Sequence, residues 1–341
     1  MAPGASFMPC LIDARGPAPS LGEPLVDEYL RFTAARVRPN TLTAQAYDLK
    51  VFFTVVPKPP VQVTTSDVLA FIEAQRTPRR GANVVRLADG EVGLAASTIR
   101  RRLATVTSLF DYLLARGIVD RQVVPRSMTP RSRSLRGSPL VRAPRRLPRI
   151  LEPVEAVALF AALRTERDRA MVTLMLHAGL RRCEVLGLRF VDVQPGDGRV
   201  FVAEGKGGHQ RIVPVVPAFF THLAAYLAQE RPTGTDAESV FVVLKGPTRG
   251  RRLTAAGLDE VLAGARRRAG LSHASCHELR HTCFTRLREA GMSLEAIQAQ
   301  AGHANLDTTR IYLHLSNDWL ATEYQQAMAV LDRLYEEGPT P

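Results

Sequence analysis

Cysteine is scarce in this sequence, and long apolar runs are absent from it. The chain has 4 cysteines among 341 residues, and no two of them form a C-x-x-C pair. This spacing suggests neither a disulfide framework nor a zinc ribbon. No stretch reaches the ~20 apolar residues that a membrane span needs, and residues 1–19 lack the basic segment and apolar run of a secretory signal. We therefore expect a cytoplasmic protein without a membrane association.

Acidic residues are outnumbered by basic ones. Lys and Arg number 45 against 33 Asp and Glu, which gives a formal net charge of +12. Such an excess favours a polyanionic partner, with nucleic acid first and an anionic membrane surface second. Basic ribosomal and structural proteins share this signature, so motifs must decide between them. The length of 341 residues exceeds the usual size of one hydrophobic core and predicts two domains.

The first domain is predicted to be helical. After a flexible start at residues 1–20, apolar residues recur at helical spacing in four blocks within residues 21–120. Residues 65–67 (Thr-Ser-Asp) have the composition of an N-cap for the third block, and Gly117 ends the fourth as a glycine after a helix does. Residues 77–96 between these blocks contain Pro and several Gly, which indicates a loop or short hairpin.

A basic linker is predicted at residues 121–150. Residues 121–151 contain nine arginines, five prolines and no acidic residue, a composition that favours an extended cationic chain. Two interpretations remain open. The segment is either a solvated tether, or it lies along DNA phosphates through arginines such as Arg131, Arg133 and Arg136, because cations that contact a polyanion release its counterions.

The second domain is predicted at residues 151–336, followed by a short tail at 337–341. Strand-like runs at 199–203 and 210–216 flank a glycine-rich turn, and helical patterns surround them. The helices are expected at 153–163, 167–178, 217–229, 254–269, 277–290, 293–301 and 317–335. The last of these has an apolar stripe that covers either the protein's own core or a neighbouring protomer.

The residues that suggest chemistry lie in this second domain. His277 and Arg280 are three positions apart, so one helix face presents both to a single ligand. Arginine offers two parallel N–H donors that match phosphate oxygens, and histidine exchanges protons near neutral pH. Together they suit phosphoryl transfer. Tyr312, nine residues after His303, supplies a hydroxyl that can act as a nucleophile.

Five elements stand in a fixed order in this domain. They are Arg181 in Gly-Leu-Arg-x-x-Glu, Lys206 in Gly-Lys-Gly followed by Arg211 and Pro214, His277 and Arg280 in His-x-x-Arg, the pair Gly302-His303, and Tyr312. In this order and spacing the chain resembles the tyrosine recombinases of the phage integrase family, which include the chromosome-dimer-resolving enzymes. The departures are small: the family often has a leucine and a serine where this chain has Ala301 and Cys183.

The resemblance implies the fold and the reaction. The fold would be mainly α, with a SAM-like core-binding domain at 21–120 and a mixed α+β catalytic domain with a small antiparallel sheet. The reaction would cut and rejoin DNA through a 3′-phosphotyrosine without a metal or nucleotide cofactor. Its partners would be a double-stranded DNA recombination site and three further protomers in a homotetramer on two such sites. The sequence does not choose between integration, excision and resolution.

The resemblance also implies a role for each matched residue. Tyr312 would be the nucleophile, while Arg181 and Arg280 would clamp the phosphate. Lys206 would be the general acid for the leaving oxygen, and His277 would act as general base or orient the phosphate. In addition, His303 would donate a hydrogen bond to the phosphate, Glu184 would support the site, and Arg211 would contact DNA.

Two other functions fit parts of the pattern. His277-Glu278-x-x-His281 matches the zinc-peptidase motif, but the metzincin extension would need glycine and histidine where Phe284 and Leu287 stand. A DNA-binding relative that has lost cleavage is the second alternative, and the complete set of candidate catalytic residues argues against it. We expect His281 to be structural, and Cys183, Cys276 and Cys283 to be small buried residues.

Overall fold

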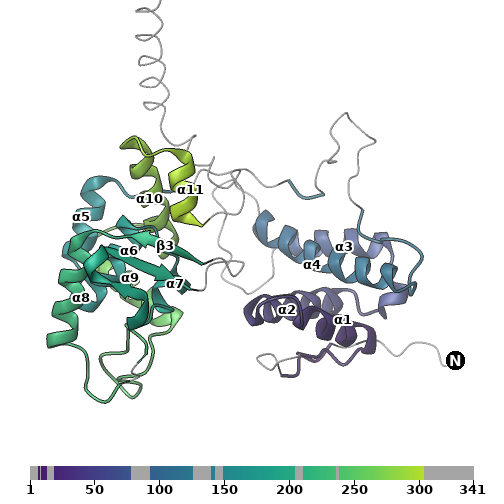
Figure 1. The fold of residues 1–341 in the computed structure, drawn as a ribbon. Helices are drawn as coiled ribbons and strands as arrows, with labels where there is room; N and C mark the ends of the chain where they lie inside the picture. Colours follow the sequence, from purple (N-terminus) through teal and green to yellow (C-terminus); the bar gives the residue numbers. More distant parts are fainter. Residues whose placement is uncertain are drawn as a thin grey trace, which may run out of the picture. The chain divides into compact units, whose positions relative to one another are not determined.

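The computed structural model describes residues 7, 9–13, 19–77, 93–125, 140–142, 149–203, 210–235 and 238–302. By its internal contacts the chain divides into two compact units, Met1–Arg145 and Arg146–Pro341 (Figure 1). Each unit has an apolar core of its own. Within the described ranges no helix has the length and apolar character needed to cross a membrane.

Helices make up the first unit in the ranges described. They are α1 (Pro24–Ala34), α2 (Pro39–Val55), a short 3-10 helix (Pro60–Gln62), α3 (Thr65–Arg76) and α4 (Ala96–Ala115). At the start of α3, Thr64 and Asp67 form a capping box in which each side chain accepts from the other's backbone N–H. The helix is therefore where its apolar pattern predicts, but its cap lies at Thr64 instead of within residues 65–67.

The core of the first unit forms where α2 and α4 pack against each other. Phe52 of α2 and Leu109 of α4 are fully buried in it, as their helical spacing predicts. Described residues from the segment predicted as a linker also enter this core, because Val123, Val124 and Val141 are buried there. These three valines thus attach parts of that segment to the first unit.

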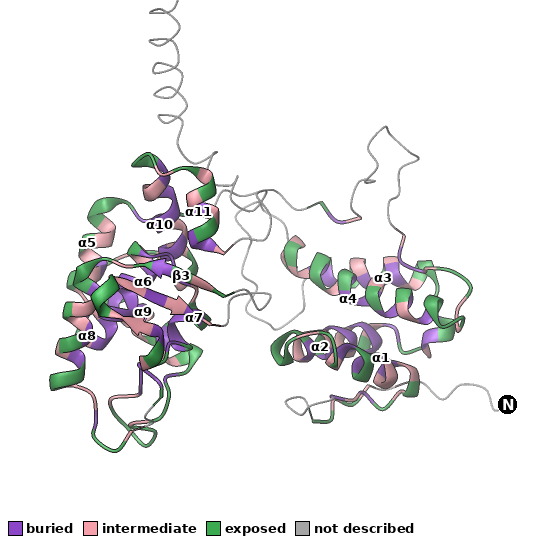
Figure 2. Ribbon diagram, in the orientation of Figure 1, coloured by how far each residue is buried: buried purple, intermediate pink, exposed green. Residues whose placement is uncertain are grey.

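The second unit mixes helices with a small sheet. Its helices are α5 (Pro153–Ala161), α6 (Glu166–His177), α7 (Arg182–Leu186), α8 (Pro217–Gln229), α9 (Ala255–Arg268), α10 (Cys276–Glu289) and α11 (Leu294–Ala301), with short 3-10 helices at Phe190–Asp192 and Pro195–Asp197. Side chains of α6 are buried on nearly every side, and this helix packs against both α8 and α10 (Figure 2). The central helix therefore fixes where α10 lies.

The sheet is antiparallel with the order β1 (Val193–Gln194), β2 (Arg199–Val202), β3 (Arg211–Pro214). In its register Val200 of β2 pairs with Val193 and with Val213. Val200 and Val213 are fully buried, so every second residue of these strands faces the core. The fold class predicted from the sequence is confirmed: the chain is mainly helical with a small antiparallel sheet.

Candidate active site

Glu184 lies at the start of α7, with its side chain fully buried. The residue before the helix, Arg181, donates its backbone N–H to Glu184 Oε2 at 2.8 Å, so the glutamate also caps the helix that carries it. The same short helix exposes Cys183, which the sequence suggested to be buried. That expectation was wrong, whereas Cys283 on α10 is buried as expected.

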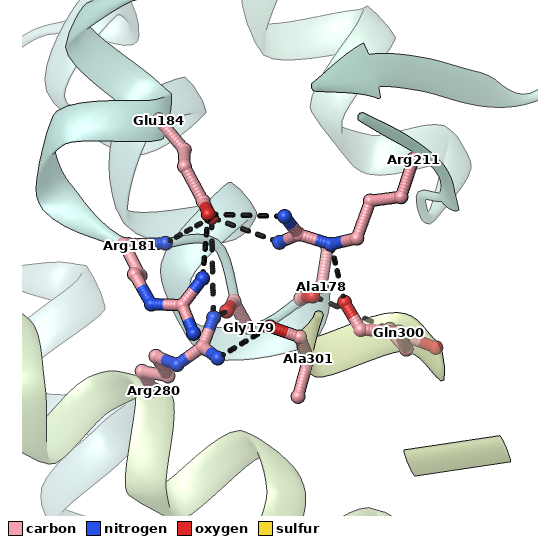
Figure 3. A network of polar contacts seen from close by, with 8 residues as sticks. All are labelled: Ala178, Gly179, Arg181, Glu184, Arg211, Arg280, Gln300 and Ala301. Carbon is pink, nitrogen blue, oxygen red and sulfur yellow. Dashed lines mark hydrogen bonds and ion pairs between the residues drawn. The ribbon is translucent and has the colours of Figure 1, made fainter. Parts of the chain in front are cut away.

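Three arginines from separate elements converge on this carboxylate (Figure 3). Arg181 donates from Nη1 to Oε1 at 2.8 Å. Arg211 of β3 binds both oxygens, with Nη1 3.0 Å from Oε1 and Nη2 2.8 Å from Oε2. Arg280 of α10 lies farther off, with Nη1 3.9 Å from Oε2. The glutamate thus gathers arginines that are distant in the sequence.

The charges of this cluster do not balance. Burial, the largest single effect, raises the pKa of Glu184, but hydrogen bonds from Arg211 and from the backbone and side chain of Arg181 outweigh it, so the pKa is below its usual value. The carboxylate is therefore ionised at neutral pH. Since three guanidinium groups surround one carboxylate, the cluster carries an excess of positive charge and suits an anion such as phosphate.

Backbone carbonyls hold Arg280 in place. Its guanidinium donates to Gly179 O and, at 2.8 Å, to Ala301 O, and it lies over the ring of Phe284 at 4.8 Å from the centroid. The residue is 3% exposed, whereas the Arg181 side chain is 20% exposed. Arg181 is therefore the more accessible of the two arginines, and Arg280 is the more deeply buried.

Gly179 has no side chain, and this leaves room for the Phe284 ring on which Arg280 lies. Its φ is +68°, in the left-handed region, and a Cβ built on it would lie 2.4 Å from Cζ of Phe284. Gly302, at the end of α11, also has a positive φ of +62°. A Cβ there would come within 3.1 Å of the Arg211 guanidinium. Both glycines of the sequence motifs thus make room for the arginine network.

Arg211 makes contacts within the protein that the sequence did not suggest. Its side chain is 9% exposed, and besides both Glu184 oxygens it binds Gln300 O through Nε at 2.8 Å. Gln300 in turn donates to Ala178 O at 3.3 Å. A guanidinium with these partners ties β3 to α7 and α11, so this geometry favours a bracing role over the DNA contact expected from the sequence.

His277 lies in the first turn of α10, where Ser275 caps the helix. Its ring is exposed and contacts His281 one turn later, with 2.8 Å between the two Nε2 atoms. Loss of hydration where the ring packs against its neighbours, followed by the charge of Arg280, lowers the pKa of His277. The helix presents His277 and Arg280 three residues apart, which is the spacing on which the sequence argument depended.

The comparisons with known proteins agree with these motifs. A model of the phage integrase family matches residues 149–318, and one of the phage integrase N-terminal SAM-like domain matches residues 26–117. Tyrosine recombinase XerC of Serratia marcescens is 30% identical over 315 residues, covering 91% of this chain and 96% of the relative. XerC of Pelobacter propionicus is 31% identical over 333 residues, covering 94% and 98%.

This chain belongs to the phage integrase family. The two relatives named above are tyrosine recombinases, and solved structures of other integrases share the fold. The lambda integrase dimer bound to a COC' core site has a TM-score of 0.63 at 17% identity, covering 86% of this chain and 96% of that one. The Tn1549 transposon integrase in complex with circular intermediate DNA has a TM-score of 0.66 at 16% identity, covering 89% and 98%.

Several predicted site residues of this integrase-family protein lie outside the described residues. They are Lys206, His303, Tyr312, Arg131, Arg133 and Arg136, together with the helix expected at 317–335. In the sequence, Lys206 falls between β2 and β3, and His303 directly follows Gly302 at the end of α11. Lys206 is thus five positions before Arg211 in the sequence, and His303 is two positions after Ala301, and both of these residues belong to the network. The roles of the undescribed residues stay predictions.

The zinc-peptidase alternative receives no support. In the described ranges no group of three or more His, Cys, Asp or Glu side chains is placed to hold a metal ion. The two histidines of the motif contact each other through their Nε2 atoms. The matches to the family models and to the XerC proteins account for the same residues as part of a recombinase.

Proposed function

We propose that this protein is a site-specific recombinase that cleaves and rejoins double-stranded DNA through a 3′-phosphotyrosyl link at Tyr312. One observation of the structure carries this proposal: the buried carboxylate of Glu184 brings Arg181 and Arg280 together. Two guanidinium groups at one place provide the paired donors that a phosphodiester needs. The membership of the family supplies the reaction.

The reaction exchanges one phosphate ester bond for another at each step. The Tyr312 hydroxyl attacks the scissile phosphorus, its proton leaves, and a P–O bond to tyrosine forms as the bond to the 5′-oxygen breaks. That oxygen takes up a proton and leaves as a 5′-hydroxyl. Attack by the 5′-hydroxyl of a partner strand reverses these steps and releases tyrosine. Since the covalent link keeps the energy of the bond, no ATP is needed.

The proposed residues have two kinds of role, which are to neutralise the charge of the phosphate and to transfer protons. Arg181 and Arg280 neutralise the nonbridging oxygens as charge develops in the transition state. Lys206 protonates the leaving 5′-oxygen, while His277 accepts the tyrosine proton or orients the phosphate, and His303 donates a further hydrogen bond. Glu184, held by Arg211, keeps the two phosphate-binding arginines in place.

The partner and the assembly follow from the same chemistry. An exchange between two DNA sites breaks four strands, so we propose a homotetramer in which each protomer supplies one Tyr312. The lambda integrase structure is described as a dimer on a core site. For this chain we propose a cytoplasmic protein with double-stranded DNA as its partner and no resident metal.

A trapping experiment tests the nucleophile. The protein is incubated in EDTA with nicked duplexes that tile the DNA flanking its gene, and adducts that resist denaturation are collected. We expect the wild type to form an adduct whose peptide contains Tyr312. The Tyr312→Phe variant keeps the ring and should bind the same duplexes without forming an adduct.

Two outcomes would overturn this assignment. An adduct formed by Tyr312→Phe would show that another residue is the nucleophile. If the wild type binds a flanking duplex but forms no adduct, the protein is instead a DNA-binding member of the family that has lost cleavage.

A further inference from the structure

His281 contacts the proposed catalytic histidine from the next turn of α10. The Nε2 atoms of His277 and His281 are 2.8 Å apart. Their rings meet edge to face, with centroids 4.2 Å apart and planes inclined at 82°. Residues four positions apart share one face of a helix, so the backbone itself keeps the pair together.

A short contact between two ring nitrogens restricts where protons sit. One nitrogen must donate and the other must accept, and a neutral imidazole carries a single N–H. Two protonated rings could not make this contact, because both nitrogens would be donors. Whichever ring donates, Nε2 of His277 is occupied by His281, and Nδ1 is the nitrogen that remains for an outside partner.

Burial, and after it the neighbouring positive charges, keep this pair neutral near pH 7. Burial, then the charge of His277 and that of Arg280, lowers the pKa of His281 to about 4. Burial and Arg280 also lower the pKa of His277, with a smaller contribution from Arg181, while Glu278 acts in the opposite direction. Near neutral pH the contact is therefore an N–H···N hydrogen bond between two uncharged rings.

We propose that His281 is a positioning residue, which holds His277 through Nε2 and leaves Nδ1 of His277 as the nitrogen that contacts the DNA. The proposal rests on the proposed function, because His277 acts on DNA only in that reaction. A fixed ring loses less freedom when the phosphate arrives, and proton transfer depends on this orientation. The residue that the sequence suggested to be structural thus acts on the chemistry through its neighbour.

The hydrogen bond can be tested without any activity. In protein labelled with 15N-histidine, we expect a scalar coupling between the Nε2 atoms of His277 and His281 at pH 7.5. We also expect a single tautomer of His277. In His281→Leu, the His277 ring should show the averaged shifts of two exchanging tautomers. A wild type without the coupling, or a His277 spectrum that His281→Leu leaves unchanged, overturns the proposal.

A matched pair of variants tests the effect on cleavage. Glutamine at position 281 can still hydrogen-bond to His277, whereas leucine cannot. A neutral hydrogen bond has a net value that corresponds to roughly 2–10-fold in rate. We expect His281→Leu to slow adduct formation by that factor with an unchanged DNA affinity, and His281→Gln to restore most of the wild-type rate.

The possible failures are distinguishable. If the wild type forms no adduct, the proposed function fails, and the coupling still decides whether His281 holds His277. If the wild type forms the adduct while the leucine and glutamine variants have equal rates, His281 acts by packing alone and the positioning role is wrong.

Discussion

Glu184 is a fully buried carboxylate that three arginines contact. A buried ion pair adds little to stability when both partners are replaced together, but removing one partner leaves the other charge unpaired. Glutamine has the shape of glutamate without its charge. We therefore expect Glu184→Gln to lower the free energy of unfolding by about 3–5 kcal/mol at pH 7, as measured by urea unfolding followed by circular dichroism.

A matched control separates burial from charge. Glu152 pairs with Arg286 at 3.0 Å, but its side chain is 66% exposed. Glu152→Gln should therefore cost at most about 1 kcal/mol. If both variants lose the same free energy of unfolding, the buried ion pairs of Glu184 do not stabilise the protein more than an exposed pair does.

The stabilisation by Glu184 should also depend on pH. The folded protein lowers the pKa of this carboxyl below its ordinary value of 4.5. A group with a lowered pKa contributes its full stability above the unfolded value, and the contribution is lost as the pH falls through the folded value. The gap between wild type and Glu184→Gln should shrink as the pH is lowered below 4.5. A gap that stays constant down to acid unfolding would contradict this account.

At the scale of elements, Gly179 shows what a motif glycine does. It has a φ of +68°, and Gly270 after α9 has +67° with nothing within 4 Å of a built Cβ. Alanine at either position costs about 1–2 kcal/mol for the left-handed backbone. At Gly179 the Cβ also meets the Phe284 ring, and such overpacking adds roughly 1–3 kcal/mol. Gly179→Ala should therefore lower the melting temperature clearly more than Gly270→Ala, and equal shifts would contradict the close contact.

Helices were predictable from the sequence because their apolar residues repeat every three to four positions. The expected ranges 217–229 and 293–301 agree closely with α8 and α11. β1 was not predictable, because two residues are too few to show an alternation. The pairing of Arg211 with Glu184 could not be predicted either. It joins β3 to α7 through the tertiary fold. In the sequence, a basic residue after a glycine-rich turn looks the same whether it pairs with a buried carboxylate or contacts DNA.

The candidate site was predictable only as a set of residues in order. The resemblance implied that Arg181 and Arg280 act on one phosphate, and the structure places both near the Glu184 carboxylate. The contact between His277 and His281 follows from helical spacing, yet the sequence offered no reason to assign it a role. Proton positions depend on which atoms meet in three dimensions, and that information is absent from a motif.

At the scale of the whole molecule, the chain folds into two compact units. Its formal net charge is +12. Nine of its arginines fall within residues 121–151, where no acidic residue compensates them. Valines of this segment belong to the core of the first unit. Four of the nine arginines fall between Val124 and Val141 in the sequence, and whether they contact DNA or stay solvated is a question for experiment.

Salt dependence distinguishes these two interpretations of the arginine-rich segment. Affinity falls as the salt concentration rises, and each lost phosphate contact makes the plot of log affinity against log salt less steep by about 0.9. If Arg131, Arg133 and Arg136 contact DNA, replacing all three by Gln should reduce the slope for a mixed-sequence duplex by up to roughly 2.7. The control replaces Arg116, Arg199 and Arg286, which pair with carboxylates, and so removes the same charge elsewhere. If both triple variants show the same slope, the segment is a tether, because net charge alone then explains the binding.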